Sequence, residues 1–348
     1  MDFEEGNNTP EGLQGGAHEP VQVPPVVEKT PVKRSGWRIF WNIILVLSVL
    51  ANVVLVLLLI GVIGMFVAGE RGIFAEEVLQ SGPRTAKIAV ITIDGIIEDE
   101  LAKEIYNQLK LAREDKRVKG VIIRVNSPGG TISGSDQIYN EIRKYRHETG
   151  KPVVAFMEGM AASGGYYTSV ACDKIVAEPM TITGSIGVIM GHFVLQQLLE
   201  EKLGIQPVIV KSGPKKDWPS PFAPFTEEQR QYIETKLITP AFERFVKVVA
   251  DGRGELTLED VRRLADGSIY GAQEALNEKL IDEIGYLDEA VEMVKSLAKI
   301  EKAEVVEYRR PFSLARFLEA RNSGIFKIEK STMYELCTPQ VLYLWTLY

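Results

Sequence analysis

A long uncharged segment near the N-terminus most constrains what this chain can fold into. No charged residue occurs from Ile39 to Gly69, a run of 31 positions. As an α-helix this run would be roughly 46 Å long, which exceeds a hydrocarbon core of about 30 Å. A buried core helix would not stay uncharged over that length, and the apolar part of a signal peptide has only about 7–15 residues. We therefore predict one retained transmembrane helix over residues 39–69, with cleavage near Ala68 as the alternative.

The charges on either side of this helix predict its orientation. Basic residues precede the apolar run and acidic residues follow it, and flanks rich in Lys and Arg stay in the cytosol. We expect a single-pass cell-membrane protein with a cytoplasmic N-terminus and an extracytoplasmic body. Segment 1–38 contains several prolines and no apolar period, so we predict a disordered cytoplasmic tail. The flanking charges are Lys33, Arg34 and Arg38 before the run and Glu70, Glu76 and Glu77 after it.

The remaining composition excludes several classes of protein. Hydrophobic residues make up 45% of the 348 residues and charged residues 25%, as in ordinary globular domains. The net charge is −7, and no long basic block offers a surface for nucleic acid. Cys172 and Cys337 lie too far apart for a metal motif or a disulfide framework. Only three histidines occur, so neither a metal nor another cofactor is expected.

Residues 86–299 have the alternating pattern of an α/β domain. Short buried strand patterns alternate with helical apolar stripes, which implies parallel pairing of the strands. Residues 70–85 are expected to be a linker and residues 300–348 a C-terminal tail. Residues 226–299 are expected to be mostly helical, with helix starts like capping boxes at Thr226 and Thr257. The predicted strands are 87–93, 121–125, 152–157, 174–177, 187–190 and 207–210, and the predicted helices include 101–113, the stripe from 138 to 145, and 194–203.

Two glycine-rich turns each follow a buried strand. One contains Pro128-Gly129-Gly130, and the other contains Ser163-Gly164-Gly165. Small residues let a backbone approach a ligand, and their free N–H groups can stabilise an oxyanion. Ser163 stands where a helix should begin, so its hydroxyl could be an exposed nucleophile. Serine is also a good N-cap, and such turns are common between a strand and a helix, so the local pattern leaves both interpretations open.

A nucleophilic serine needs a base, and spacing alone does not single one out. His147 lies opposite the apolar stripe of its helix and should face water. His192 follows a glycine in a predicted turn and has no acidic residue beside it. A lysine can serve instead if burial lowers its pKa enough to leave it neutral. The candidates are Lys211, Lys215 and Lys216, although such a charged run is more commonly a solvated surface.

Several motifs, in order along the chain, resemble the signal peptide peptidase A family, the S49 serine peptidases with a ClpP/crotonase-like fold. The resemblance covers about residues 86–299 and fits the short form of the family, which has one catalytic copy. It implies an α/β fold of parallel strands alternating with helices. The matching stretches are RVNSPGGT (124–131), MAASGGYY (160–167), TGSIGVIM (183–190), KSGPKKD (211–217), DGSIY (266–270) and ALNEKLIDEIG (275–285).

The resemblance implies a role for each site residue. Ser163 matches the nucleophile, and Lys216 matches the general base, the lysine directly before an aspartate. Ser185 matches the serine that orients the lysine, although it could be only a turn residue. Gly130 and Gly164 match the backbone N–H donors of the oxyanion hole. Since a lysine base must be neutral, an alkaline pH optimum is expected.

The resemblance also implies partners. Protomers of the short form build a dome-like ring, an octamer in the family, and neighbouring subunits complete the active sites. The resemblance leaves open whether Ser163 and Lys216 of one active site belong to the same chain or to two neighbouring chains. A body anchored beside the bilayer implies apolar peptide substrates, chiefly signal peptides after their release from preproteins. An extended substrate would pair as an added strand beside Gly130.

Other function classes stay open at this point. The crotonase-like fold also hosts acyl-CoA enzymes, and a non-catalytic membrane scaffold could share it. The anchor, the Lys216 motif and the lack of a convincing pair of acidic catalytic residues favour the peptidase. Covalent labelling of Ser163 would discriminate between these classes. Cys172 follows Ser163 at a packing position, so we expect it in the core.

The end of the tail, residues 341–348, is strongly apolar. In VLYLWTLY, Thr346 is the only polar residue that is not aromatic. The segment resembles the apolar region of a signal peptide, and we hypothesise that it occupies the substrate groove as an inhibitor or a self-processed substrate. A strand packed on the body and an interfacial anchor are the alternatives.

Overall fold

The computed structural model describes residues 36–70, 74–310 and 341–345. Helix α1 (Gly36–Glu70) contains a segment, Gly36–Gly64, of 29 residues with a mean hydropathy of 3.3. This segment is long and apolar enough to span a membrane, and its side chains are exposed. The helix agrees with the span predicted over residues 39–69. The predicted tail lies outside the described residues up to residue 35.

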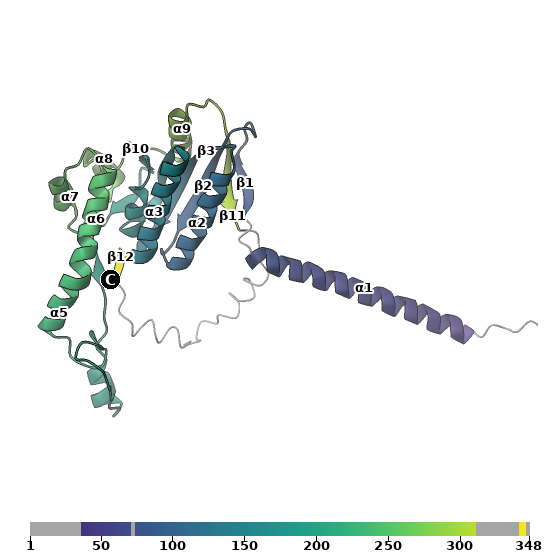
Figure 1. The fold of residues 1–348 in the computed structure, drawn as a ribbon, viewed down its shortest axis with the longest axis horizontal. Helices are drawn as coiled ribbons and strands as arrows, with labels where there is room; N and C mark the ends of the chain where they lie inside the picture. Colours follow the sequence, from purple (N-terminus) through teal and green to yellow (C-terminus); the bar gives the residue numbers. More distant parts are fainter. Residues whose placement is uncertain (1–35, 71–73, 311–340, 346–348) are drawn as a thin grey trace, which may run out of the picture. The chain divides into compact units, whose positions relative to one another are not determined.

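The body is built on a large sheet and a small one (Figure 1). The strands are β1 (Ala75–Gln80), β2 (Lys87–Asp94), β3 (Val118–Ser127), β4 (Gly129–Thr131), β5 (Val153–Ala162), β6 (Lys174–Ala177), β7 (Ile182–Gly184), β8 (Ile189–Met190), β9 (Ile269–Gly271), β10 (Glu283–Ile284), β11 (Glu304–Arg309) and β12 (Val341–Leu344). The large sheet has nine strands, with the main order β1–β11–β2–β3–β5–β6–β10 and with β7 and β9 branching from β5. Along that path only β1 and β11 are antiparallel. The small sheet, β4–β12–β8, is antiparallel.

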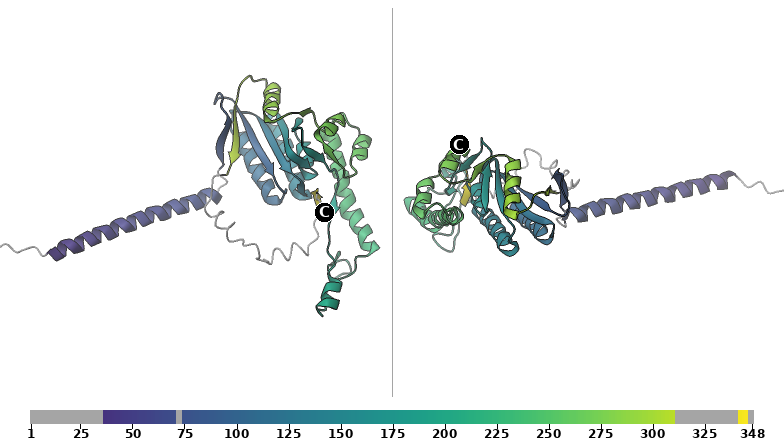
Figure 2. Two further views of the ribbon diagram at one scale, coloured as in Figure 1. Left: turned by 180° about the vertical axis from the view of Figure 1, so that it is seen from behind. Right: turned by 90° about the horizontal axis from the view of Figure 1, so that it is seen from above.

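Helices cover both faces of the large sheet, as Figure 1 and Figure 2 show. They are α2 (Asp99–Glu114), α3 (Ile132–Thr149), α4 (Gly164–Ser169), α5 (Glu227–Ile233), α6 (Thr239–Gly252), α7 (Leu258–Leu264), α8 (Ala272–Asn277) and α9 (Leu287–Ala298), with π-helical turns η1 (Leu198–Lys202) and η2 (Glu234–Ile238). Strand β2 shows the two layers, because its side chains alternate between the faces. Ile91 and Ile93 pack in the core with α2 and α3, and Ile88 and Val90 pack in the core with α9. Burial on both faces is typical of parallel sheets.

The large sheet extends beyond the body boundaries expected from the sequence. Strand β1 lies in the segment expected to be a linker, and β11 lies in the segment expected to be a tail. The two strands pair with each other, and β11 also pairs with β2. Because β1 is mostly exposed and carries two glutamates, its composition resembles a linker more than a buried strand.

The segment from 191 to 226 differs from its prediction. Residues 207–210 form no strand, and the helix expected over 194–203 is reduced to η1 and the two residues before it. Val208 and Val210 are 83% and 95% exposed, so their apolar pattern is not covered by the described residues. The capping boxes predicted at Thr226 and Thr257 are both present and begin α5 and α7.

Candidate active site

Ser163 stands at the turn between β5 and α4. Its side chain is 1% exposed, and its backbone has a φ of 50°. Positive φ is uncommon for residues other than glycine, and such strain collects at functional sites. The Ser163 N–H donates to the Gly184 carbonyl oxygen at 2.8 Å, which holds the turn against β7. Ser163 occupies the N-cap position of α4, but its side chain makes no capping hydrogen bond to that helix.

Ser185 occupies a matching turn on the neighbouring strand. Strands β5 and β7 pair with Ala162 opposite Gly184, so each serine directly follows a paired position. Ser185 also has a positive φ, of 49°, and is 7% exposed. Its N–H donates to the Ser268 carbonyl oxygen at 2.7 Å. The structure therefore brings Ser163 and Ser185 together at the carboxyl ends of parallel strands, where ligand sites form in such sheets.

Three glycines form the backbone next to Ser163. A Cβ built on Gly129 would lie 2.8 Å from the Gly164 nitrogen, and one built on Gly164 would lie 3.1 Å from the Gly129 Cα. Gly130 bridges to Ile97, and a Cβ there would lie 2.1 Å from the Ile97 carbonyl oxygen. The motif identified Gly130 and Gly164 as candidates. It did not identify Gly129, whose φ of +108° becomes visible only in the structure.

The three candidate lysines lie in the exposed segment before α5. The Lys211 ammonium pairs with Asp217 at 2.7 Å. The Lys215 ammonium pairs with Glu228 at 3.6 Å and lies 4.8 Å from the centres of two aromatic rings. Lys216 is exposed and, among the described residues, has no ion pair. Within this single chain, Lys216 shows no hydrogen bond or ion pair to either serine.

The histidines and the described cysteine have other surroundings. His147 is exposed on α3, as predicted. His192 packs near Phe225, and its Nε2 lies 3.2 Å from the Ser220 carbonyl oxygen. Cys172 is 5% exposed within the core, as predicted, and burial raises the pKa of its thiol. Across the described ranges, no three His, Cys, Asp or Glu side chains are placed to hold a metal ion.

The chain's own strand β12 lies beside the glycines. It pairs antiparallel with β4, with Tyr343 opposite Gly130, and with β8, with Leu342 opposite Ile189. The pairing continues at Trp345, whose N–H donates to the Pro128 carbonyl oxygen at 2.9 Å. Extended peptides bind sheet edges in this way. Residues 341–345 therefore lie along the strand where a substrate was expected to pair.

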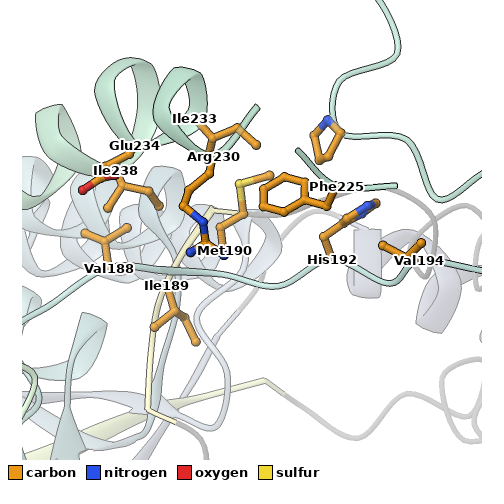
Figure 3. Close-up of a pocket in the computed structure, with 11 residues that line it drawn as sticks. Val188, Ile189, Met190, His192, Val194, Phe225, Arg230, Ile233, Glu234 and Ile238 are labelled. Atoms are coloured by element: carbon orange, nitrogen blue, oxygen red, sulfur yellow. The ribbon is translucent and has the colours of Figure 1, made fainter. Parts of the chain in front are cut away.

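A separate pocket of about 600 Å³ adjoins β8 (Figure 3). Figure 3 shows Val188 and Met190 on the pocket side of their segment, while Ile189 is turned away from the helix that carries Ile233. Eight of the eleven lining residues are apolar, and His192, Arg230 and Glu234 add polar groups to the wall. The lining residues are Val188, Ile189, Met190, His192, Val194, Pro219, Phe225, Arg230, Ile233, Glu234 and Ile238.

Comparison with family models identifies both the site region and the fold. A model described as peptidase family S49 matches residues 145–301, which include Ser163, Ser185 and Lys216. A model described as Clp protease matches residues 75–181, which include most of the large sheet. The ClpP-like α/β fold expected from the sequence is thereby confirmed.

Individual proteins with protease names are similar to this chain. A provisionally named signal peptide peptidase SppA of Enterococcus faecium is 40% identical over 67% of this chain and 70% of its own length. A chloroplastic serine protease SPPA of Arabidopsis thaliana is 34% identical over 66% of this chain and 34% of its own length. A solved ClpP1 mutant of Listeria monocytogenes aligns with 58% of this chain and 94% of its own, at 22% identity and a TM-score of 0.40.

Proposed function

Because this chain belongs to peptidase family S49 and is a serine-type protease, we propose that it is a membrane-anchored endopeptidase with a Ser163/Lys216 dyad. Its proposed substrates are apolar peptides, chiefly signal peptides after their release from preproteins. The observation that carries the proposal is the strained turn at Ser163. That serine is buried, has a positive φ, makes no capping hydrogen bond to its helix and lies beside three glycines that no side chain could replace without a clash.

The proposed reaction needs one proton carrier and one oxyanion site. Neutral Lys216 accepts the Ser163 proton while Oγ attacks the peptide carbonyl carbon and forms a C–O bond. The N–H groups of Gly130 and Gly164 stabilise the oxyanion. Its collapse breaks the C–N bond, and Lys216 gives the proton to the leaving amine. Water then hydrolyses the ester by the same route and regenerates Ser163, while Ser185 orients the lysine.

In this proposal the lysine comes from a neighbouring copy of the chain. The segment that precedes Lys216 exposes large apolar side chains, with Val208 83% and Val210 95% exposed. Exposed apolar surface of this kind marks interaction sites. If a second copy of the chain covers this segment, Lys216 of the first copy would lie next to Ser163 of the second copy. Contacts of this head-to-tail type close into rings, which suits the expected dome-like oligomer, an octamer in the family.

The anchor limits which peptides this protease meets. Helix α1 tethers the body, and the flanking charges favour a cytoplasmic N-terminus and an extracytoplasmic body. Cleaved signal peptides are apolar and remain in the bilayer, so a tethered protease encounters them at the membrane surface. The groove between β4 and β8 would hold such a peptide as an added strand.

Substitution of the dyad in the full-length protein tests the mechanism. With a fluorogenic apolar peptide at about pH 8–9, Ser163→Ala and Lys216→Ala should each lower kcat/KM by at least about 1,000-fold. Lys215→Ala is the matched control, one residue away, and should keep its activity within a few-fold. If Lys216→Ala stays active, the base is another residue, with Lys211, Lys215 and His192 as the candidates. If wild type is silent, the same assay without residues 331–348 separates a tail-blocked peptidase from other classes. If that shortened protein neither cleaves nor reacts with a fluorophosphonate at Ser163, an acyl-CoA enzyme or a scaffold becomes the better assignment.

Mixing the two inactive variants tests the shared site. Suppose that the lysine and the serine of one site come from different chains. An assembly of equal amounts of Ser163→Ala and Lys216→Ala should then contain an intact serine and an intact lysine in about a quarter of its active sites. If the dyad lies within one chain, the mixture stays inactive.

The pH profile tests the chemical nature of the base. A lysine must lose its proton to act, so kcat/KM should rise into the alkaline range. An optimum below about pH 6 would exclude a lysine base.

A further inference from the structure

We propose that the Ser135 hydroxyl is a third hydrogen-bond donor of the oxyanion site, beside the N–H groups proposed for Gly130 and Gly164. It donates to the carbonyl oxygen that becomes negative when Ser163 attacks a peptide bond. The inference rests on the proposed peptidase function and adds a catalytic residue to it. Two observations carry it: the hydroxyl is buried without a partner, and it lies against Gly164, directly after the proposed nucleophile.

The Ser135 hydroxyl is buried and unpaired. The residue is 0% exposed, and its Oγ has no hydrogen-bond partner among the residues that the structure describes. Burying a hydroxyl without a partner costs folding free energy, and an alanine at the same position would avoid that cost. Because the serine lowers stability relative to alanine, a ligand explains its hydroxyl better than folding does.

One other hydroxyl in the described ranges is buried without a partner, and it lies far from the site. It belongs to Tyr145, which is on the same helix, α3. Tyr145 follows Ser135 by ten residues. Those residues correspond to about 15 Å along the helix axis. Ser135 is therefore the unpaired hydroxyl at the end of α3 that adjoins the proposed nucleophile.

The Ser135 hydroxyl lies against Gly164, the first residue of α4. A Cβ on Gly164 would lie 2.5 Å from Ser135 Oγ, so the hydroxyl occupies space that a side chain at position 164 would need. The same Cβ position is 3.1 Å from the Tyr343 carbonyl oxygen, a peptide carbonyl beside the glycines. A peptide carbonyl group and the Ser135 hydroxyl therefore approach Gly164 on the same side. A donor to the oxyanion needs this arrangement.

Helix α3 holds the hydroxyl in place. The helix begins directly after β4, the strand that carries Gly130 (Figure 1). The Thr131 side chain caps it and accepts a hydrogen bond from the Gly134 N–H at 3.0 Å, one residue before Ser135. One turn later, the Tyr139 ring packs against Tyr167 of α4 with centroids 5.3 Å apart. A donor fixed in this way needs little reorganisation during the reaction.

The proposed role of Ser135 forms and breaks no covalent bond. As Ser163 Oγ forms the C–O bond, the electron pair of the carbonyl double bond moves onto the oxygen. The Ser135 hydroxyl, whose hydrogen can rotate, donates to that oxygen together with the two glycine N–H groups. Ser135 keeps its proton, and its hydrogen bond weakens when the oxyanion collapses and the C–N bond breaks. The same donor acts again when water attacks the ester.

Kinetics of the full-length Ser135→Ala protein test the proposal. On a fluorogenic apolar peptide at about pH 8–9, kcat should fall by about 100-fold, as for the loss of one oxyanion donor, while KM changes by no more than a few-fold. Ser133→Ala is the matched control, because this exposed serine on the same turn bonds to Gln137. Tyr145→Phe removes the other unpaired hydroxyl. Both controls should keep kcat within about twofold of wild type.

Binding of a peptidyl aldehyde gives a second readout. Ser163 Oγ adds to the aldehyde carbon, the serine proton passes to the base, and the aldehyde oxygen becomes the oxyanion without any leaving group. Ser135→Ala should therefore weaken inhibition by about the same factor as it lowers kcat/KM. Its melting temperature should stay equal to that of wild type or rise, because an unpaired buried hydroxyl is removed. A purely structural serine would show the opposite change in stability.

The outcomes separate this inference from the proposed function. If Ser135→Ala keeps kcat within about threefold of wild type, the third donor is wrong and the peptidase function stands. A loss of activity that comes with a lower melting temperature and unchanged aldehyde binding would also overturn the inference. If wild type cleaves no faster than Ser163→Ala, with or without residues 331–348, the proposed function fails and the third donor fails with it.

Discussion

At Gly129 the backbone leaves no room for a side chain. Its φ is +108°, and a Cβ would lie 2.0 Å from the Tyr343 carbonyl oxygen and 2.8 Å from the Gly164 nitrogen. Gly129→Ala should therefore obstruct both the oxyanion site and any strand bound beside it. We expect kcat/KM to fall by about 100-fold or more, the usual effect of losing an oxyanion donor.

Gly95→Ala is the matched control for that substitution. Gly95 has a φ of +74° and nothing within 4 Å of its Cβ position, so alanine there adds backbone strain without a clash. Gly95→Ala should lose about 1 kcal/mol of folding stability through backbone strain alone, and Gly129→Ala should lose more because its Cβ also clashes with backbone atoms. Only Gly129→Ala should lose activity, and similar activities for the two variants would show that Gly129 has no role beyond the turn.

The sequence identified some site residues and missed others for physical reasons. Ser163 and Ser185 stand in recognisable motifs, and the structure places them at adjacent turns. Gly129 escaped notice as a site residue because its importance depends on contacts between segments far apart in the chain, whereas residues 341–348 were already expected in the groove. Lys216 stays a prediction, since its proposed partner serine belongs to another copy.

At the scale of elements, the joint between α2 and β3 contains an ionised carboxylate. A hydrogen bond from Arg117 lowers the pKa of Asp115 from 3.8 to about 2. Because the pKa in the folded state is lower than in the unfolded state, ionised Asp115 stabilises the fold above about pH 3.8. This contribution is lost as the pH falls through about 2.

Asp115→Asn should therefore destabilise the protein at neutral pH but not in strong acid. We expect a loss of about 1 kcal/mol at pH 7, modest because Arg117 is half-exposed and water screens the pair. Urea unfolding across the pH range measures it. Glu114→Gln is the neighbouring control: it has no ion pair among the described residues and should change little. A loss that persists unchanged at pH 2 would mean that packing, not charge, explains the effect.

Strand β12 provides a prediction about regulation of the full-length protein. If β12 competes with substrate for the groove, Tyr343→Ala should raise kcat/KM on a peptide substrate by about tenfold. Removing a fully buried aromatic ring costs about 3–5 kcal/mol of binding, enough to release the strand. Leu342→Ala, on the half-buried side of the same strand, should raise the activity less. Parallel losses of activity and thermal stability in Tyr343→Ala would instead make β12 a structural strand.

Sequence reasoning predicted well the elements that are determined by residues close together in the chain. Strand β6 and the two capping boxes agree with their predictions because local residues determine them. Strands β1 and β11 were not expected, since the exposed edge strand β1 and its buried neighbour β11 pair over more than 200 residues of sequence. The strand predicted at 207–210 does not form, because no strand among the described residues lies beside these two exposed valines.

For the whole molecule, the exposed valines predict dependence of activity on assembly. The double variant Val208→Asp/Val210→Asp should keep the fold, because these side chains are 83% and 95% exposed within the chain. Charges there would oppose burial against a second copy, so light scattering should detect smaller particles. Activity should fall by about 100-fold or more, because Lys216 no longer reaches the neighbouring Ser163. Leu297→Asp, which charges an exposed leucine on α9, should change neither property.

Rescue by a second chain distinguishes lost assembly from damage to the site. The double variant keeps its own Ser163, and the Ser163→Ala protein keeps an intact apolar segment and Lys216. If the segment of one copy covers the site of the next, mixing the two proteins should restore activity to the double variant. Monomers of the double variant that remain fully active would place the base within one chain. If the mixed proteins fold and assemble but stay inactive, the apolar segment is not what brings Lys216 to the neighbouring Ser163.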